Sequence, residues 1–404
     1  MELSDRVRRL APSFALAIHY RYKEMLRQGK DVVSFGVGEP DFDTPAHIRK
    51  AGIEAIEQGY TKYSVTPGYP ELREAICFLL KKRYGLEYEP VNVIVSVGGK
   101  QSIVNAMIAL LNPGDEVLIP VPAWFSYHEP ARLVDGVPVF IPTRKEEEFQ
   151  LKAQEVAQRI TRKTKLLILN TPNNPTGSMI DEEELAKIAA LAVRHNFYII
   201  SDEIYCKIVF DHRKYVSIAA LDPRVKERTI TINGFSKAYA MTGWRVGYAA
   251  GPKEIISAMG LIQGHFTSGT NSMAQRAALA AVYGPQDFIG EMVQEYDRRR
   301  RVILSRLNSI PGISCFPPHG TFYAFPDISG LFGKTLGGKK IQNSLDFGNY
   351  LLESEGVAVV PGSAFEGEGH LRLSFACSLE VINSGCDRIE RAVNNVKKVT
   401  SSSL

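Results

Sequence analysis

The stretch GFSKAYAMTGWR, residues 234–245, is the most informative part of this 404-residue sequence. It follows TITIN, residues 229–233, a β-branched run that is typical of a strand. Ser236 and Lys237 are therefore expected at the carboxyl end of a strand. A lysine among small and aromatic residues can lose its proton on burial, which favours a nucleophilic amine over an exposed loop lysine. Arg245, eight residues later, offers a planar fork suited to a phosphate group.

Upstream of this stretch, short β-rich runs alternate with amphipathic helical patterns. The expected strands cover residues 93–97, 116–119, 165–169 and 197–200, and the expected helices cover residues 101–111 and 182–195. This alternation predicts an α/β fold with a mostly parallel sheet covered by helices on both faces. Ligands of such sheets bind outside the carboxyl ends of the strands, where the polar segments of this sequence lie.

The pattern changes after residue 290, where a long charged helix is expected over residues 291–307. A chain of this length is too long for one compact core. We expect residues 1–45 to form an N-terminal arm and part of a small domain. Residues 46–290 would form the large domain, and residues 291–404 the rest of a smaller α+β domain. The arginine run at residues 298–301 has acidic neighbours, which predicts a solvated helix face.

The overall composition excludes several classes of protein. Its 48 basic and 44 acidic residues are spread along the chain and give a net charge of +4, so no nucleic-acid footprint is expected. No run approaches the roughly 18 apolar residues that a membrane span needs. The five cysteines form no CxxC pair and no HExxH motif occurs. We therefore expect free thiols, no metal site and a reduced, cytoplasmic location.

A second informative segment is FYIISDEIY, residues 197–205, in which Asp202 ends an apolar strand. A buried carboxylate without a partner is costly, and the N–H of a cationic ring would satisfy it. At about 4 Å and an effective dielectric near 20, that attraction is about 4 kcal/mol before desolvation is subtracted. Tyr205 is placed to bond the same ligand. From this segment alone, an Asp202 that caps the next helix is an equally open interpretation.

Two further turns follow predicted strands. The turn NTPNNPTG, residues 170–177, presents the amide of Asn174, although a purely structural turn is the competing interpretation. Gly98 and Gly99 open a helix, where backbone N–H groups and the helix dipole favour a phosphate. The residues around Lys100 do not have Walker A spacing, so this signal is weak by itself.

Three isolated residues complete the set of candidates. Trp124 could stack on a flat ring. Arg372 lies in an alternating strand and could bind a carboxylate bidentately. For these two, and for Tyr63, a core or surface position is the more usual role when each is considered alone.

Together, these segments resemble the class I/II aminotransferases of pyridoxal-5′-phosphate (PLP) fold type I, from about residue 5 to residue 396. The resemblance is closest to the aspartate aminotransferases of the bacterial and archaeal subgroup that includes bifunctional prephenate aminotransferases. The segments that carry it are residues 38–45, 62–63, 96–101, 173–177, 201–205, 237–245, 359–362 and 372–374. No single motif decides the matter, but their order and spacing together are very specific.

The resemblance implies a role for each candidate residue. Lys237 would carry PLP as a Schiff base and move a proton during catalysis, and Asp202 would pair with the ring nitrogen. Arg372 would bind the substrate α-carboxylate. The other implied cofactor contacts are Tyr205, Asn174, Trp124, Gly98, Gly99, Ser236, Arg245 and, from the second subunit of a homodimer with shared active sites, Tyr63. The other implied substrate contacts are Gly38, Lys100, Trp124 and Asn174.

The implied reaction is amino transfer between two small molecules, L-aspartate and 2-oxoglutarate. The alternatives are a prephenate, aromatic or broad-range aminotransferase, or a PLP-dependent C–S lyase. A PLP-sensing regulator would need a DNA-binding domain for which we expect no room before residue 5. One departure concerns PSFA, residues 12–15: Ala15 stands where the subgroup usually has a threonine for the distal carboxylate. Lys100, the other expected contact, is present.

Overall fold

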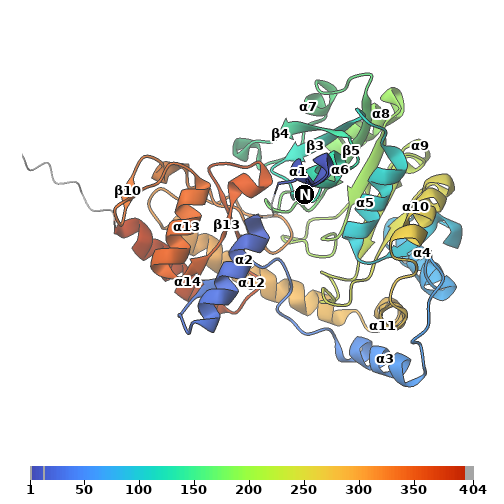
Figure 1. Ribbon diagram of the computed structural model, residues 1–404, viewed down its shortest axis with the longest axis horizontal. Helices are drawn as coiled ribbons and strands as arrows, with labels where there is room; N and C mark the ends of the chain where they lie inside the picture. Colours follow the sequence, from blue (N-terminus) through green and yellow to red (C-terminus); the bar gives the residue numbers. More distant parts are fainter. Residues whose placement is uncertain (1, 12–13, 396–404) are drawn as a thin grey trace, which may run out of the picture.

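The computed structural model describes residues 2–11 and 14–395, and its centre is a seven-stranded sheet (Figure 1). The strand order is β2 (Val93–Ser96), β8 (Gly247–Ala250), β7 (Thr229–Gly234), β6 (Tyr198–Asp202), β5 (Thr164–Asn170), β3 (Glu116–Val121) and β4 (Val137–Pro142). Only β8 runs antiparallel to its neighbours in this sheet. The predicted α/β class and the mostly parallel sheet are confirmed.

Alternating side chains of the strands pack on opposite faces of the sheet. In β5, Leu166 and Ile168 belong to one apolar cluster, while Leu167 and Leu169 belong to another. The first face is covered by α5 (Gly99–Leu110), α6 (His128–Leu133) and α10 (Lys253–Phe266). The opposite face is covered by α3 (Ala46–Glu57), α4 (Pro70–Tyr84), α7 (Ala153–Ala157), α8 (Glu182–His195), α9 (Pro223–Lys226) and α11 (Ser272–Tyr283). Burial on both faces explains why strands such as β2 and β3 are almost continuously apolar.

A second, smaller body lies beside the first and is built mainly from the C-terminal part of the chain (Figure 1). Its helices are α12 (Asp287–Asn308), α13 (Ser344–Glu355) and α14 (Leu379–Asn394). Its strands are β9 (Tyr323–Ala324), β10 (Thr335–Leu336), β11 (Lys339–Lys340), β12 (Val357–Ala358), β13 (Val360–Pro361) and β14 (Leu371–Ser374). Strands β13, β14 and β9 form an antiparallel sheet, and β10 pairs with β11.

The N-terminal segment adds to both bodies. Helix α1 (Asp5–Arg8) lies near α6, whereas α2 (Phe14–Arg27) packs beside the small body and β1 (Val33–Ser34) pairs with β12. Phe35 is fully buried in the small body's apolar cluster. The N-terminal segment thus contributes to the small α+β body. The boundaries at residues 45 and 290 stay a prediction.

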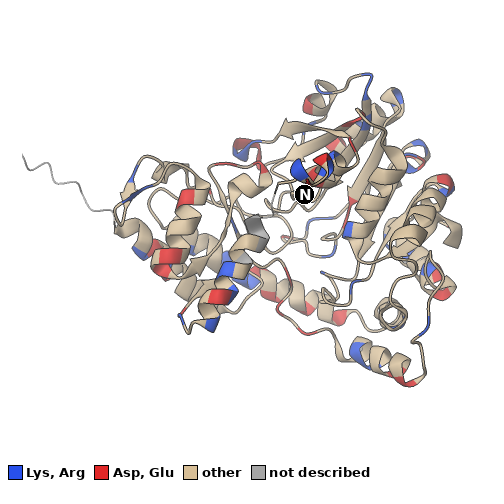
Figure 2. Cartoon of the chain, viewed as in Figure 1, with Lys and Arg blue, Asp and Glu red and all other residues tan. Residues whose placement is uncertain are grey.

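Short 3₁₀ turns connect several of these elements. They are η1 (Pro90–Asn92), η2 (Lys145–Glu147), η3 (Ile218–Ala220), η4 (Ser329–Leu331) and η5 (Gly362–Phe365). Charged side chains of both signs are interspersed over the two bodies (Figure 2). Within the described residues, no helix is long and apolar enough to cross a membrane, and all five cysteines are free, as predicted.

The arginine run in α12 corrects one expectation. Arg298 and Arg301 are exposed, but Arg299 and Arg300 are buried. Arg300 donates to Asp211 and forms an ion pair with Asp297. The prediction of a solvated face was therefore wrong for these two residues. Consecutive residues on a helix point about 100° apart, so a run of four cannot share one environment.

Candidate functional site

The predicted site residues gather around a cavity of about 520 Å³ at the carboxyl ends of β5, β6 and β7. Residues of the small body and of the segment after β1 close its other side. The predicted residues that line it are Gly38, Gly99, Lys100, Trp124, Asn174, Asp202, Tyr205, Ser236, Lys237, Arg245 and Arg372. Gly98 lies beside the cavity, and Tyr63 is not part of its lining.

Lys237 extends into this cavity three residues after the end of β7. Its Nζ donates to the carbonyl oxygen of Gly38 and lies 5.9 Å from the ring centre of Tyr205. Burial, reinforced by the positive charge of Arg372, lowers the pKa of Lys237 to about 8. The neutral amine, which a nucleophilic lysine requires, is therefore more populated near neutral pH than in an ordinary lysine.

Asp202 is the last residue of β6 and lies at the base of the cavity, almost completely buried. Its Oδ2 accepts a hydrogen bond from the Tyr127 hydroxyl at 2.7 Å, and its Oδ1 accepts one from the Ile204 N–H at 3.2 Å. Burial raises the pKa of Asp202 to about 6, although these two donors and Lys237 oppose the shift. The carboxylate does not cap a helix, so the capping interpretation is wrong.

Arg372 projects from β14 of the small body toward the large one. Its Nη1 donates to Asn174 Oδ1 at 3.1 Å, and its Nη2 donates to the Gly36 carbonyl at 2.8 Å. The guanidinium carbon lies 4.5 Å from the ring centre of Tyr323. Among the described residues, Nε of this buried arginine has no hydrogen-bond partner. An orphaned buried donor beside a cavity is a place where a ligand oxygen would be stabilised.

The N-terminus of α5 forms another wall of the site. Gly98 has φ +77°, and a Cβ there would lie 2.6 Å from Arg245 Nη2, so only glycine lets the guanidinium approach. Arg245 Nη1 donates to the Thr242 carbonyl at 2.9 Å. Ser236 is buried nearby on the cavity lining. Free helical N–H groups, a hydroxyl and a guanidinium together make a cradle suited to a phosphate.

Trp124 and Lys100 line the same cavity. The Trp124 ring is perpendicular to that of Tyr127 at 5.5 Å. Lys100 Nζ lies 4.7 Å from the Trp124 ring centre and 5.7 Å from that of Phe125. Burial and the nearby charge of Arg245 lower the pKa of Lys100. Within the described residues Lys100 makes no ion pair, so its ammonium is available to an anionic group.

Two parts of the sequence with a predicted role at the site are not placed at the cavity by the structure. Tyr63 is 99% exposed and does not reach the cavity of its own chain. In the segment that carries Ala15, Pro12 and Ser13 lie outside the described residues, and the side chain of Ala15 is not described either. The expected consequence of Ala15, the loss of the contact that a threonine would make with the distal carboxylate, therefore stays a prediction.

Sequence reasoning missed several residues of the site. Tyr127 binds Asp202, and the Asn170 side chain joins the Asp202 carbonyl to the Asn174 N–H, at 3.0 and 2.8 Å. Tyr323 places its hydroxyl 2.9 Å from that of Tyr205. Asn170 directly follows a predicted strand and could have been included on that ground. The two tyrosines carry no local signal of this kind.

The family described as aminotransferase class I and II matches residues 30–389 of this chain. An aspartate/prephenate aminotransferase of Cereibacter sphaeroides is 45% identical over 390 residues, which cover 96% of this chain and 98% of that relative.

Two solved structures have the same fold. An aspartate aminotransferase from Rhizobium meliloti superposes with a TM-score of 0.95 at 41% identity, covering 98% of this chain and 100% of that one. An aspartate aminotransferase from Thermus thermophilus with maleate gives a TM-score of 0.92 at 40% identity, covering 97% and 100%. At these identities and coverages the similarity extends over the whole architecture described above.

Proposed function

The chain belongs to the class I and II aminotransferase family, and from this membership we propose that it transfers the amino group of L-aspartate to 2-oxoglutarate with PLP attached to Lys237. The observation that carries the proposal is the convergence of Lys237, Asp202 and Arg372 on one cavity from three separated parts of the sequence. An amine of lowered pKa, a buried carboxylate and a guanidinium with an orphaned N–H are the groups that PLP-dependent amino transfer needs.

The lining of the cavity fits PLP. The phosphate would lie against Arg245, Ser236 and the first N–H groups of α5, where Gly98 leaves room for the guanidinium. Asp202 at the opposite end would accept the ring N–H, and Trp124 would lie against the ring. When bound, PLP supplies a carbonyl that condenses with amines and a protonated ring that withdraws electrons from the substrate Cα.

The chain's own residues would perform the remaining tasks. Lys237 would hold the cofactor and then, as a free amine, move the proton at the substrate Cα. Tyr127 and Ile204 hold the Asp202 carboxylate in place, where it would accept the ring N–H of the cofactor. Arg372 and Asn174 would orient the substrate through its α-carboxylate, with Tyr205 at the polar edge of the ring.

Aspartate is favoured over other donors by one group in the cavity. Lys100, an exposed cation on the same cavity lining as Arg372, makes no ion pair within the described residues, which suits a substrate with a second carboxylate. Aspartate and maleate, named for the similar proteins above, are both dicarboxylic. Prephenate, also a dicarboxylate, is the second candidate, since one relative carries both names. An aromatic or broad-range donor and C–S lysis are weaker alternatives.

A half-reaction screen tests this proposal. The purified enzyme with PLP is mixed with single amino acids, and conversion to the pyridoxamine form is followed by absorbance. Aspartate and glutamate are expected to convert the enzyme fastest, and 2-oxoglutarate to reverse the change. Conversion by aromatic amino acids alone would contradict the dicarboxylate assignment, and release of a thiol from cysteine conjugates would favour the lyase.

Lys100→Ser is expected to weaken the use of dicarboxylic substrates selectively. Without the ammonium, the distal carboxylate is left unpaired in the cavity. For aspartate and glutamate, kcat/KM should fall by a factor that corresponds to about 2–3 kcal/mol. Alanine and phenylalanine should be nearly unaffected. The measurement is kcat/KM for all four donors, together with the PLP dissociation constant. Equal slowing of all four with weaker PLP binding would mean that Lys100 serves the cofactor phosphate instead.

We propose that the enzyme is a homodimer with shared active sites. Tyr63 is fully exposed, and large apolar side chains on α3, α10 and α11 are exposed with it: Ile53, Ile56, Leu261, Phe266 and Tyr283. Joined into one patch, apolar side chains of this size would favour a protein interface. In such a dimer Tyr63 would reach the phosphate bound by the partner. The free thiols support a reduced, cytoplasmic location for it.

Hybrid dimers test whether the sites are shared. Mixing Tyr63→Phe and Lys237→Ala homodimers would produce hybrids with one doubly defective site and one intact site. Activity should therefore rise above the average of the two parents as subunits exchange. A mixture of the natural protein with Lys237→Ala is the control and should stay at the average. With exchange confirmed by mass spectrometry, an unchanged average in the first mixture would mean self-contained sites.

A further inference from the structure

Residues 36–44, here called the strap, cross from the small body to the loop that carries Lys237. Just before the strap, the Phe35 N–H donates to the Ala358 carbonyl at 2.8 Å. At its far end, Thr44 Oγ1 donates to the Ala240 carbonyl at 2.5 Å. Within the described chain, no backbone–backbone hydrogen bond involves a strap residue. The course of the strap therefore depends on side-chain contacts.

Two carbonyl groups of the strap accept hydrogen bonds from cations of the active site. The Gly38 carbonyl accepts one from Lys237 Nζ, and the Gly36 carbonyl accepts one from Arg372 Nη2 at 2.8 Å. A displaced strap would leave the Arg372 fork without one of its supports. The orientation of the α-carboxylate partner is thus linked to the position of the strap.

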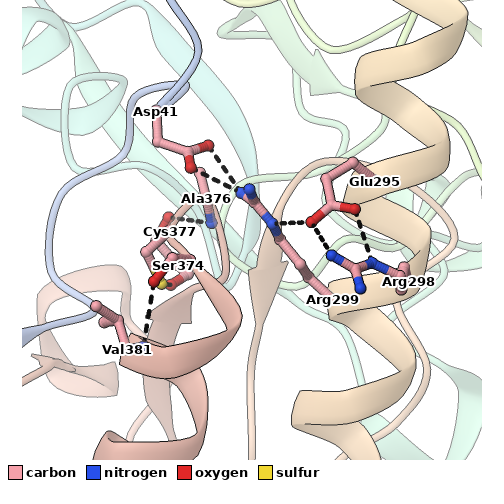
Figure 3. Close-up of polar contacts among 9 residues, drawn as sticks. Asp41, Glu295, Arg298, Arg299, Ser374, Ala376, Cys377 and Val381 are labelled. Carbon is pink, nitrogen blue, oxygen red and sulfur yellow. Dashed lines mark hydrogen bonds and ion pairs between the residues drawn. The ribbon is translucent and has the colours of Figure 1, made fainter.

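Arg299 of α12 is the buried cation that binds the strap; the other ion pair of the strap, Asp43 with Arg49 at 3.7 Å, is exposed. Its Nη1 donates to both oxygens of Asp41, at 2.8 and 2.9 Å, and its Nε donates to Glu295 Oε1 at 2.8 Å (Figure 3). The guanidinium carbon lies 5.3 Å from the ring centre of Phe42. The Arg299 side chain is only 8% exposed, while that of Asp41 is 30% exposed.

If Arg299 served only to stabilise α12, its contact with Asp41 would have no explanation. Glu295 already bonds Arg298 on the exposed side of α12, through Nε at 2.7 Å and Nη2 at 2.9 Å. Arg299 adds a contact to Asp41, which is 258 positions away in the sequence. A buried arginine needs carboxylate partners, and here one of the two is supplied by the strap.

We propose that Arg299 is a positioning residue: through Asp41 it fixes the strap and thereby keeps Arg372 oriented for the substrate α-carboxylate. This inference rests on the role proposed above for Arg372. The residue does not touch the cavity, so its influence on catalysis would be exerted entirely through the strap.

Hydrogen exchange provides a test that needs neither cofactor nor substrate. In the cofactor-free protein, Arg299→Leu and Asp41→Asn are expected to increase amide exchange in peptides that span the strap and its first end, through the hydrogen-bonded N–H groups of Phe35 and Gly36, with little change in β5 to β7. Arg298→Leu is the matched control, because it removes a Glu295 partner from the same helix without touching the strap. Unchanged strap exchange in both variants would overturn the proposal.

Kinetics supply the second test. For Arg299→Leu and Asp41→Asn we expect KM for both the amino acid and the oxo acid to rise about tenfold, with a much smaller change in kcat, because small misplacements of a binding group weaken binding strongly. Arg299→Lys keeps the charge but cannot serve both carboxylates, so an intermediate KM is expected. Arg298→Leu should keep the natural KM.

The combined pattern separates positioning from general stability. The Arg299→Leu/Asp41→Asn double variant should be no worse than the worse single variant, since the two residues act as one unit. A looser strap with unchanged KM would refute the link to Arg372. If Arg299→Leu fails to fold, Asp41→Asn, on the more accessible partner, supplies both readouts. If the natural enzyme does not convert aspartate, the proposed function fails while the exchange result still stands.

Discussion

Lys237→Ala is expected to abolish nearly all turnover while PLP still binds noncovalently. Removing a positioned acid–base group alone costs about 10²–10⁴-fold, and here the covalent attachment is lost as well. Arg245, Ser236 and Asp202 would still hold the cofactor at its two ends. The measurements are the PLP dissociation constant and the rate of the half-reaction with aspartate.

Peptide mapping after borohydride reduction identifies the attachment site directly, and Lys207 provides the matched control. Burial lowers the pKa of Lys207 to about 7, so it is the appropriate lysine with which to compare Lys237. Its Nζ, however, donates to the Tyr239 hydroxyl and lines a separate cavity with Arg83 and Tyr84. Lys207→Ala should leave the pyridoxyl label on Lys237, and a label on Lys207 in the natural protein would refute the assignment.

The rate at which PLP attaches to the cofactor-free protein should depend on pH in a definite direction. Condensation needs the neutral amine, and burial lowers the pKa of Lys237 to about 8. The rate should therefore rise with pH and level off above that value, well below the pKa of about 10.4 for an ordinary lysine. A profile still rising steeply at pH 9 to 10 would mean that the reacting lysine is exposed.

Arg372→Lys is expected to lower kcat/KM. The corresponding loss of transition-state stabilisation is about 2–4 kcal/mol, the range for truncating a buried charge pair. The ammonium keeps the charge but loses the planar fork that now reaches Asn174 and Gly36 on two different segments. The loss should affect every substrate, because all of them carry an α-carboxylate. This distinguishes the variant from Lys100→Ser, whose effect should be restricted to dicarboxylic substrates.

Arg300→Lys is the control for this second prediction. Arg300 is as deeply buried as Arg372 but binds Asp211 and the Pro318 carbonyl, away from the cavity. The Arg300→Lys substitution should lower the melting temperature of the enzyme with little change in the KM of its substrates. An Arg372→Lys enzyme with near-natural kcat/KM would remove Arg372 from the substrate site.

The order of strands and helices in the large body could be predicted from the sequence because it depends on local signals. Apolar runs end in turn residues, so Asp202, Asn174 and Lys237 were expected at strand ends before the sheet was known. Helix α8 (Glu182–His195) was predicted with its observed bounds. Parallel strands place their carboxyl ends at one edge of the sheet, and the common location of these residues follows from that rule.

The contacts that complete the site had no such local signal. Tyr127 and Tyr323 were not predicted, because each meets its partner, Asp202 or Tyr205, only through the packing of distant segments. The strap contains no regular element, so no periodicity indicated where its carbonyls would lie.

The arginine run of α12 shows most clearly what only the tertiary structure decided. Four consecutive arginines with acidic neighbours are typical of a solvated face, yet Arg299 and Arg300 are buried against Asp41 and Asp211. Hydrophobic patterning determines which elements form and which apolar faces they bury. Whether a charged residue on such an element is exposed depends on a carboxylate brought to it from far along the chain, and that is decided only when the two bodies and the strap are packed together.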